Sequence, residues 1–285
     1  MCRLKNWFFL FIVASVAQPL RAQPILLQIK PRIGDTLSVR LNQQVEMTGT
    51  PTGCVPADSS RRRNTTTAPR LRPCSEGPRH MTTKMEVFSR AIIKRSSPEG
   101  TFVLAVTDSI RTASGAQAKT TPPSRINAPN HVVELRIATD GGAEVVDAAA
   151  TEELRTIFGQ MPATLSRKPV SPGERWMREM RIPLSAEPGG TGLVRTNFQL
   201  DSLGRDGDVA YISMRGTLYH DHKDGSGSEM SGQLIGSMQF DRRLAWITDM
   251  RVTITTESTV KRGSGSEPMH VRTRVTQLLK AGPSR

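Results

Sequence analysis

The sequence of 285 residues has few aromatic side chains, few cysteines and almost no long apolar runs. Phe, Trp and Tyr make up only 5% of the chain, and they are not interleaved with the arginines as a platform for single-stranded nucleic acid requires. Beyond one apolar run near the N-terminus, no stretch is long enough to cross a bilayer as a helix. We therefore expect no nucleic-acid partner and no transmembrane span in the mature chain.

The sequence also lacks the signatures of common catalytic sites. It contains no Gly-x-Ser-x-Gly nucleophile elbow, no phosphate-binding loop and no dinucleotide-binding fingerprint. None of the histidines stands in a context typical of a catalytic triad; they are His80, His131, His220, His222 and His270. We therefore expect a protein that is not an enzyme, with no catalytic residues and no cofactor.

The first 22 residues are typical of a secretory signal peptide. A positively charged start precedes an apolar run over 7–16, and cleavage is expected after Ala22. The run is short for a bilayer span, and its retention as an N-terminal anchor is the alternative. Cys2 precedes the run, so the cysteine that carries the lipid anchor of lipoproteins is missing. We expect a mature chain that is exported, either periplasmic or extracellular.

Two cysteines remain after cleavage, Cys54 and Cys74, in a polar loop over 49–80 that is rich in Pro, Ser, Thr and Arg. In an oxidising compartment an isolated pair predicts a disulfide, which stabilises by about 3 kcal/mol in the chain-entropy model. A metal or redox pair would need Cys-x-x-Cys spacing or histidines close by, and the sequence has neither.

The chain carries a formal net charge of +13, and loss of the three positive charges in the first 22 residues leaves +10. A basic surface can attract anionic lipid, polysaccharide or nucleic acid. Because the basic residues are scattered along the chain, we interpret this charge as a generally basic surface. It identifies no partner more specific than an envelope component.

The sequence of the mature chain predicts a series of short β-strands. Apolar and polar residues alternate, which is typical of strands that bury one face, and the 23 glycines and 19 prolines supply frequent turns. Asp140-Gly141 between alternating apolar residues is a strong hairpin signal. The segments with this pattern are 37–47, 81–94, 101–110, 133–146, 176–182, 193–203, 209–219, 233–256 and 271–278.

One segment, 148–162, predicts a short α-helix. Thr151 can cap its start and Pro162 ends it. Its apolar residues form a single stripe that we expect to pack on a sheet, with a partner-binding or membrane role as the alternative. The stripe consists of Ala150, Leu154, Ile157, Phe158 and Met161.

Short matching patterns suggest an internal repeat. Gly34-Asp35-x-Leu37 and Gly173-Glu174-x-Trp176 each open a strand-like segment. We interpret both as structural turns, with Trp176 as a core anchor. Two aspartates, Asp140 and Asp241, occupy equivalent turns further along, where a side-chain-to-backbone cap is more usual than an acid–base pair.

These patterns predict a mainly β protein with two pseudo-repeated antiparallel β halves, joined by one short α-helix. The halves are 23–147 and 163–281, the linking helix is 148–162, and a disordered tail is 282–285. The halves can form one curved sheet or a sandwich. A curved sheet would have a concave apolar side, which side chains alone can also fill.

The stretch Pro169-Val170-x-x-Gly173-Glu174-x-Trp176, followed by strands, resembles an uncharacterised family of bacterial exported β-rich proteins, a domain of unknown function. The pattern of that family is Pro-Val-x-x-Gly-Asp-x-Trp, and Glu174 stands where Asp is usual. The resemblance implies an exported protein of the cell envelope, and it implies no catalytic residues.

A weak metal-binding candidate lies in a polar segment rich in Gly and Ser. His220 and His222 would face the same side of a strand end, and Asp224 could join them, which is a donor set suited to Zn²⁺. Histidines in such loops are more often simply solvated, so we expect no metal site here.

Three functions therefore remain open. The first is a non-catalytic protein that acts by binding or interaction at the bacterial cell envelope. The second is a carrier for a lipid or other apolar ligand, held on the concave face of the sheet. The third is a metal-dependent hydrolase that uses the region of His220 and His222.

Overall fold

The computed structural model describes residues 23–52, 77–115, 124–126, 132–147, 163–183, 191–220, 230–260 and 268–284. Nearly all of its regular structure is β, and no helix occurs within these ranges. Three predictions lie outside the described residues: the signal peptide at 1–22, the helix at 148–162, and the disulfide between Cys54 and Cys74.

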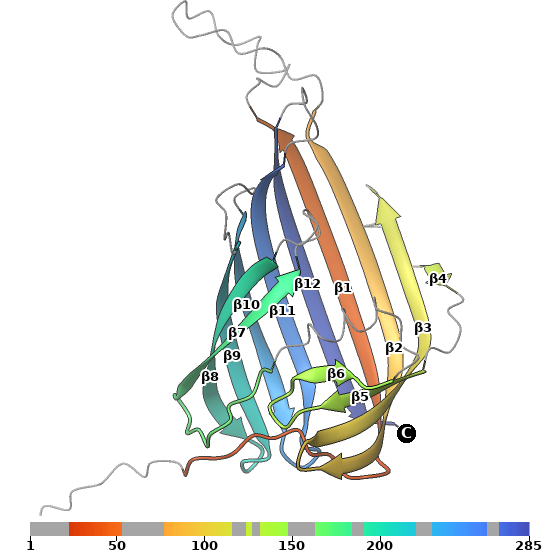
Figure 1. Ribbon diagram of the computed structural model, residues 1–285, viewed down its shortest axis with the longest axis vertical. Helices are drawn as coiled ribbons and strands as arrows, with labels where there is room; N and C mark the ends of the chain where they lie inside the picture. Colours follow the sequence, from red (N-terminus) through yellow and green to blue (C-terminus); the bar gives the residue numbers. More distant parts are fainter. Residues whose placement is uncertain are drawn as a thin grey trace, which may run out of the picture.

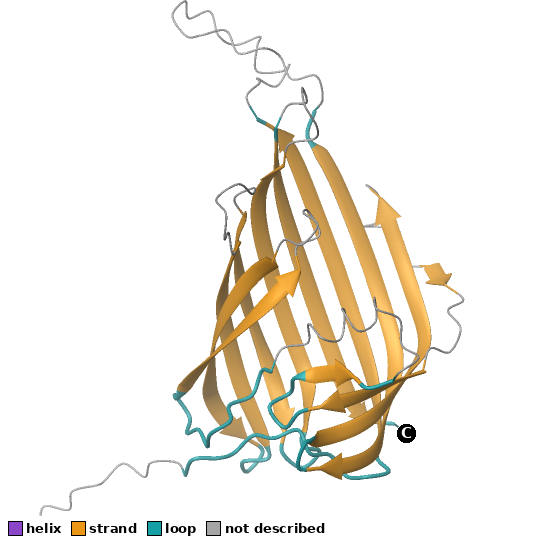
Figure 2. Ribbon diagram, viewed as in Figure 1, coloured by secondary structure: helices purple, strands orange, loops and turns teal. Residues whose placement is uncertain are grey.

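Twelve strands form one antiparallel sheet, so the described residues adopt the curved sheet and not the sandwich (Figures 1 and 2). Across the sheet the order is β6, β5, β3, β2, β1, β12, β11, β10, β9, β8 and β7, and β4 pairs with β3 off this path. The strands are β1 (Thr36–Pro51), β2 (Arg79–Ser97), β3 (Gly100–Gly115), β4 (Ser124–Ile126), β5 (Val132–Ile137), β6 (Ala143–Val145), β7 (Arg175–Pro183), β8 (Thr191–Gly204), β9 (Val209–His220), β10 (Met230–Asp241), β11 (Trp246–Val260) and β12 (Met269–Pro283).

The first and last long strands meet in the middle of this sheet. From β1 the chain meanders outwards to β6, passes to the opposite edge at β7, and meanders back to β12. The β12 strand then pairs with β1 along its whole length, from Leu37 opposite Pro283 to Pro51 opposite Met269. The hairpin predicted at Asp140-Gly141 is confirmed as β5–β6, and β2–β3 and β10–β11 are hairpins as well.

The sheet is strongly curved, and Figure 1 shows its two ends, β5–β6 and β7, in front of the central strands. Residues on the concave side of β9 and β10 are small where the curvature brings neighbours close. A Cβ at Gly236 would lie 2.5 Å from the carbonyl oxygen of Arg251, and one at Gly216 would lie 2.7 Å from Oγ1 of Thr196. Bulges in β8 and β11 add further bending.

The main core lies on the concave side of β8 to β11, beneath two irregular segments that cross it. Leu27 and Ile29 come from the segment before β1, whereas Leu165 and Val170 come from the segment before β7, and all four are buried. A bridge between Ile25 and Val170 joins the two segments, with N–O distances of 2.9 and 2.8 Å. The sheet contributes Val194, Phe198, Leu200, Ala210, Ile212, Met214, Leu218, Leu234, Met238, Phe240 and Val252.

A smaller core cluster lies on the other side of the sheet's centre, on β1, β2 and β3. Its most buried members are Leu37, Ile93 and Val103, which are 1–2% exposed. Ile137 and Trp246 pack against both clusters, so the two ends of the sheet share one apolar interior at this level.

The C-terminal residues do not form the disordered tail that the sequence predicted from residue 282. Gly282 and Pro283 belong to β12, where they pair with Ser38 and Leu37, and the backbone N–H of Ser284 donates to Thr36 O at 2.9 Å. The prediction was wrong for these residues because the backbone of β1 offers them partners that local composition does not reveal.

The turn at Gly34 sets the start of β1. Gly34 has a φ of 88°, a backbone conformation that favours glycine. Its N–H donates to Ile93 O, and the N–H of Ile93 donates to Asp35 O, both at 2.9 Å. The turn therefore places the first residues of β1 beside β2.

The turn at Gly173 repeats this arrangement at the start of β7. Gly173 has a φ of 90°. Its N–H donates to Leu200 O at 2.6 Å, and the N–H of Leu200 donates to Glu174 O at 3.1 Å. The Glu174 side chain also accepts a 2.8 Å hydrogen bond from the N–H of Ser171. The two motifs found in the sequence thus have the same backbone pattern.

Trp176 lies on β7, on the concave face of the sheet. Its ring stacks on Phe198, directly opposite on β8, with centroids 5.7 Å apart and planes 9° apart. Its indole N–H donates to Thr164 O at 2.9 Å. The half-buried side chain therefore attaches the segment before β7 to the edge of the sheet.

Replacing this side chain tests its role. We expect Trp176→Ala to lower the free energy of unfolding by about 3 kcal/mol, because both the ring packing and the hydrogen bond are lost. Urea denaturation measures the change. Met177→Ala is the matched control, since Met177 is the next residue, points to the other face and is 53% exposed. Equal effects of the two substitutions would contradict an anchoring role for Trp176.

Candidate functional site

The two ends of the curved sheet are joined by one buried carboxylate. Asp140 lies in the turn between β5 and β6, and its side chain is only 8% exposed. Its Oδ2 accepts a 2.9 Å hydrogen bond from Nε of Arg167 and lies 3.4 Å from Nη2 of Arg178. Arg178 belongs to β7, at the opposite edge of the sheet. We call these three residues the clasp.

Backbone contacts support the clasp. The N–H groups of Thr164 and Leu165 both donate to the carbonyl oxygen of Asp140 at 2.9 Å. Arg178 donates to the carbonyl oxygen of Leu165 as well as to the carboxylate. The segment before β7 therefore bridges the two edges of the sheet, and the end of the sheet nearest Asp140 is held together.

The two turn aspartates of the sequence have different surroundings. The carboxylate of Asp241 accepts hydrogen bonds from the N–H groups of Arg243 and Leu244 at 2.9 and 3.0 Å. The carboxylate of Asp140 receives a long 3.4 Å hydrogen bond from the N–H of Gly142, and its stronger contacts are with the two arginines. The arginine contacts indicate a structural role that reaches across the sheet.

Removal of the clasp carboxylate tests this role. We expect Asp140→Ala to destabilise the protein by about 3 kcal/mol, because the substitution leaves the partly buried Arg178 without its anionic partner. Thermal and urea unfolding measure the loss. The control is Asp108→Ala, whose partner Arg90 is exposed and for which we expect a nearly unchanged midpoint. Equal stability of the wild type and the Asp140 variant would rule out the clasp.

A stretch of apolar side chains on the concave face belongs to neither buried cluster. We call it the central apolar face: Leu41, Val45 and Met47 of β1, Met85 and Val87 of β2, and Val275 and Leu279 of β12. The strand register places these residues on one side of three adjacent strands. All are only half-buried, so no described part of the chain covers them completely.

The opposite face of the same strands is polar and charged. Along β1 it carries Arg40, Asn42, Gln44, Glu46 and Thr48, which alternate with the residues of the central apolar face. Ion pairs link neighbouring strands on this convex side, such as Arg40 with Glu86 at 3.5 Å. Water therefore solvates the convex side well, whereas the concave side offers a neutral, apolar surface.

A pocket of about 570 Å³ lies where the central apolar face reaches the end of the sheet furthest from the clasp. Its lining is rich in methionine, with Met47, Met81 and Met269, and includes Val260 and Val271. Methionine side chains adapt to ligands of irregular shape. We call this the methionine pocket.

One glycine shapes the methionine pocket. A Cβ on Gly49 would lie 2.6 Å from Sδ of Met269, so the absence of a side chain lets this methionine lie across β1. Arg79, directly opposite Gly49 on β2, brings a positive charge to the mouth of the pocket.

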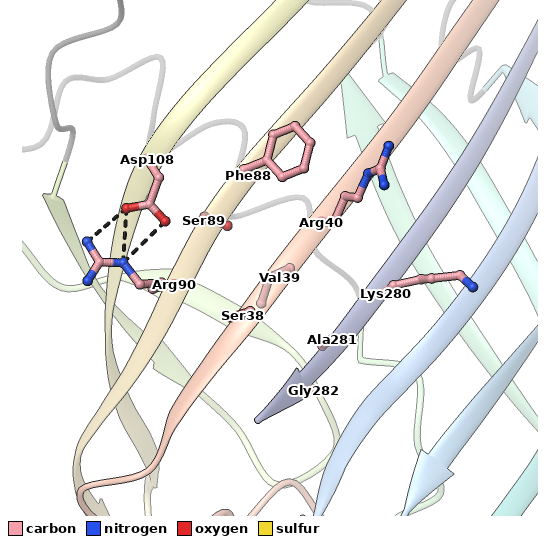
Figure 3. Close-up of a pocket in the computed structure, with 10 residues that line it drawn as sticks. All are labelled: Ser38, Val39, Arg40, Phe88, Ser89, Arg90, Asp108, Lys280, Ala281 and Gly282. Carbon is pink, nitrogen blue, oxygen red and sulfur yellow. Dashed lines mark hydrogen bonds and ion pairs between the residues drawn. The ribbon is translucent and has the colours of Figure 1, made fainter. Parts of the chain in front are cut away.

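A second, smaller depression of about 350 Å³ lies on β1, β2, β3 and β12 (Figure 3). The ring of Phe88 lies between two guanidinium groups, 5.1 Å from that of Arg40 and 5.3 Å from that of Arg111. Arg90 donates to Asp108 at 3.0 Å, and this hydrogen bond together with the charge of Asp108 raises the pKa of Arg90. Both arginines of the depression are thus already engaged by carboxylates.

The candidate metal site of the sequence lies mostly outside the described residues. His220 ends β9, while His222 and Asp224 fall in a range that the structure does not describe. In the part of the chain that is described, no group of three or more His, Cys, Asp or Glu side chains is arranged to hold a metal ion. The described residues therefore do not bear on the metal-dependent hydrolase.

Comparison with known proteins gives no family for this chain. No model of a protein family matches the sequence, and no curated protein matches it significantly. A structural search finds an outer membrane channel from Pseudomonas putida F1, which is 9% identical and aligns over 92% of this chain and 100% of that chain. Its TM-score is 0.22, too low to carry an argument about fold or function. No described helix is long and apolar enough to cross a membrane.

Proposed function

We propose that the protein is an exported, non-catalytic binding protein that holds an apolar or amphipathic ligand against the concave face of its sheet. The observation that supports this proposal is the central apolar face, half-buried and continuous with the methionine pocket. Pockets for small ligands are usually concave and mostly apolar, with a few polar groups.

The energetics favour a ligand with a long apolar part. Each methylene group that leaves water contributes about 0.8 kcal/mol. The central apolar face spans three strands and carries no charged side chain, so a chain-like ligand would lose water without separating an ion pair. Contiguous apolar surfaces that the rest of the chain leaves partly accessible often mark a binding site.

The place of action follows from the sequence. The N-terminal segment predicts export, and the basic composition suits an envelope compartment with anionic surfaces. We propose a periplasmic or extracellular carrier. The less favoured candidate is a protein that only contacts another envelope component through its surface. Arg40 and Arg90 of the depression on the convex face already form ion pairs with Glu86 and Asp108, so they are less available to such a partner.

We also propose that the two halves of the sheet derive from one repeated unit. The turns at Gly34 and Gly173 share their backbone pattern, and each opens the first strand of a meander. Six antiparallel steps separate β1 from β7 across the sheet, so the two strands run in the same direction. A rotation about the axis of curvature would superpose such halves, with β12 as an additional strand.

Binding of the apolar fluorescent probe N-phenyl-1-naphthylamine tests the proposed function. We expect the wild-type protein to enhance the emission of the probe in a saturable way. The double variant Val45→Thr and Val275→Thr keeps the side-chain shape but adds hydroxyl groups to opposite positions of the central apolar face. We expect about tenfold weaker binding, because each hydroxyl must lose water without gaining a partner.

The control for this experiment changes the other face of the same strand. Gln44→Thr alters a residue of the convex side and is expected to leave probe binding unchanged. Circular dichroism and the unfolding midpoint establish that each variant is folded. A wild-type protein that does not bind the probe, or a double variant that binds it equally well, would refute the carrier.

A further inference from the structure

Two glutamines lie directly opposite each other in the middle of the central apolar face. Gln43 of β1 pairs with Gln277 of β12 in the strand register. In the same row, Met85 lies beyond Gln43 on β2, and Val252 lies beyond Gln277 on β11. The two amides thus stand side by side between apolar neighbours.

Apolar pairs also surround the glutamines along the strands. Two residues nearer the clasp, Leu41 faces Leu279, and two residues nearer the methionine pocket, Val45 faces Val275. The glutamines therefore interrupt a largely apolar surface near its centre, on both of the strands that meet there. The other polar side chains of β1, β2 and β12 beside this stretch, Thr83 and Thr273, lie nearer the methionine pocket.

Neither amide has a hydrogen-bond partner among the described residues of the protein. Two other glutamines of the sheet are engaged: Gln44 donates to Glu46 at 2.9 Å, and Gln199 accepts from Arg175 at 2.7 Å. Two free amides on an apolar, concave surface are suited to a ligand, because each offers one acceptor and two donors.

We propose that Gln43 and Gln277 bind the neutral carbonyl group, an ester or an amide, of a long-chain acyl ligand. This inference rests on the proposed function and names its ligand class. A neutral polar group fits because none of the six flanking residues is charged, so an anion here would lose water without gaining a counter-charge. A carbonyl oxygen can accept a donor from each glutamine.

The acyl chain then runs from the glutamines towards the methionine pocket. Gln43 and Gly49 are six residues apart on β1, which corresponds to about 20 Å at the rise of an antiparallel strand. Val45 and Met47 line this path on β1, and Met269 lies at its end. The flexible methionines allow chains of different lengths to end in the same pocket.

Competition between two matched ligands tests the inference. Methyl laurate and pentadecane have the same number of non-hydrogen atoms, and only the first has a carbonyl group. Both are delivered from cyclodextrin to displace N-phenyl-1-naphthylamine from the protein. In the double variant Gln43→Leu and Gln277→Leu, we expect methyl laurate to bind roughly tenfold more weakly relative to pentadecane than in the wild type.

An infrared measurement reports on the carbonyl group itself. With ¹³C at the ester carbon, we expect the carbonyl band of bound methyl laurate to lie at lower frequency in the wild type than in the double variant, because hydrogen bonds weaken the C=O bond. Gln44→Leu, on the convex face, serves as the control and should behave as the wild type. Leucine fits an apolar surface, so we expect the variants to fold.

The outcomes separate the two proposals. Suppose that the wild type binds the probe and both ligands, and that its affinity for methyl laurate relative to pentadecane equals that of the double variant. The role of the glutamines is then refuted and the carrier stands. An unshifted carbonyl band in the wild type leads to the same conclusion. If the wild type binds neither the probe nor either ligand, the proposed function and this inference both fail.

Discussion

The pairing of β1 with β12 is the constraint on which the rest of the structure depends. It joins the two ends of the chain through a ladder that runs from Leu37 opposite Pro283 to Pro51 opposite Met269. Without it the protein would have two separate sheets, each with a long exposed edge that invites association with other chains. With it, the concave side becomes one surface, and the residues that line its centre come from both ends of the sequence. The proposed ligand surface is thus a product of this single pairing.

Curvature converts that surface into a concave one, and the clasp limits how far it can open. Glycines such as Gly236 remove the side chains that would collide on the inner side of the bend. At one end of the sheet, Asp140 and Arg178 connect opposite edges, and the two core clusters meet there through Ile137 and Trp246. Towards the other end the side chains become half-buried. The molecule therefore combines a tightly packed end, which supplies stability, with a less buried end, which is the proposed ligand site.

The strands were predictable because each one buries a single face. Apolar and polar residues therefore alternate along its sequence. The sequence also identified the turns at Gly34 and Gly173. Alternation specifies which face a residue occupies but not which strand lies beside it, so the pairing of β1 with β12 could not be predicted. Arg178 was missed for the same reason, since an arginine in an alternating strand usually faces water. Gln43 interrupts the apolar series between Leu41 and Val45, and this interruption is the one signal that could have drawn attention to it.

The central position of β12 also has a consequence for the order of folding. Synthesis delivers the N-terminal strands first, and β1 must wait for its partner until almost the whole chain has emerged. Contacts between residues so far apart in sequence are slow to form, because the entropy of a long loop is lost before they are gained. Until then the free edge of β1 lacks its neighbour, and the apolar side of β1 and β2 is more exposed than in the folded protein. The strand that completes the proposed binding surface is therefore also the strand that closes the last open edge in the middle of the sheet.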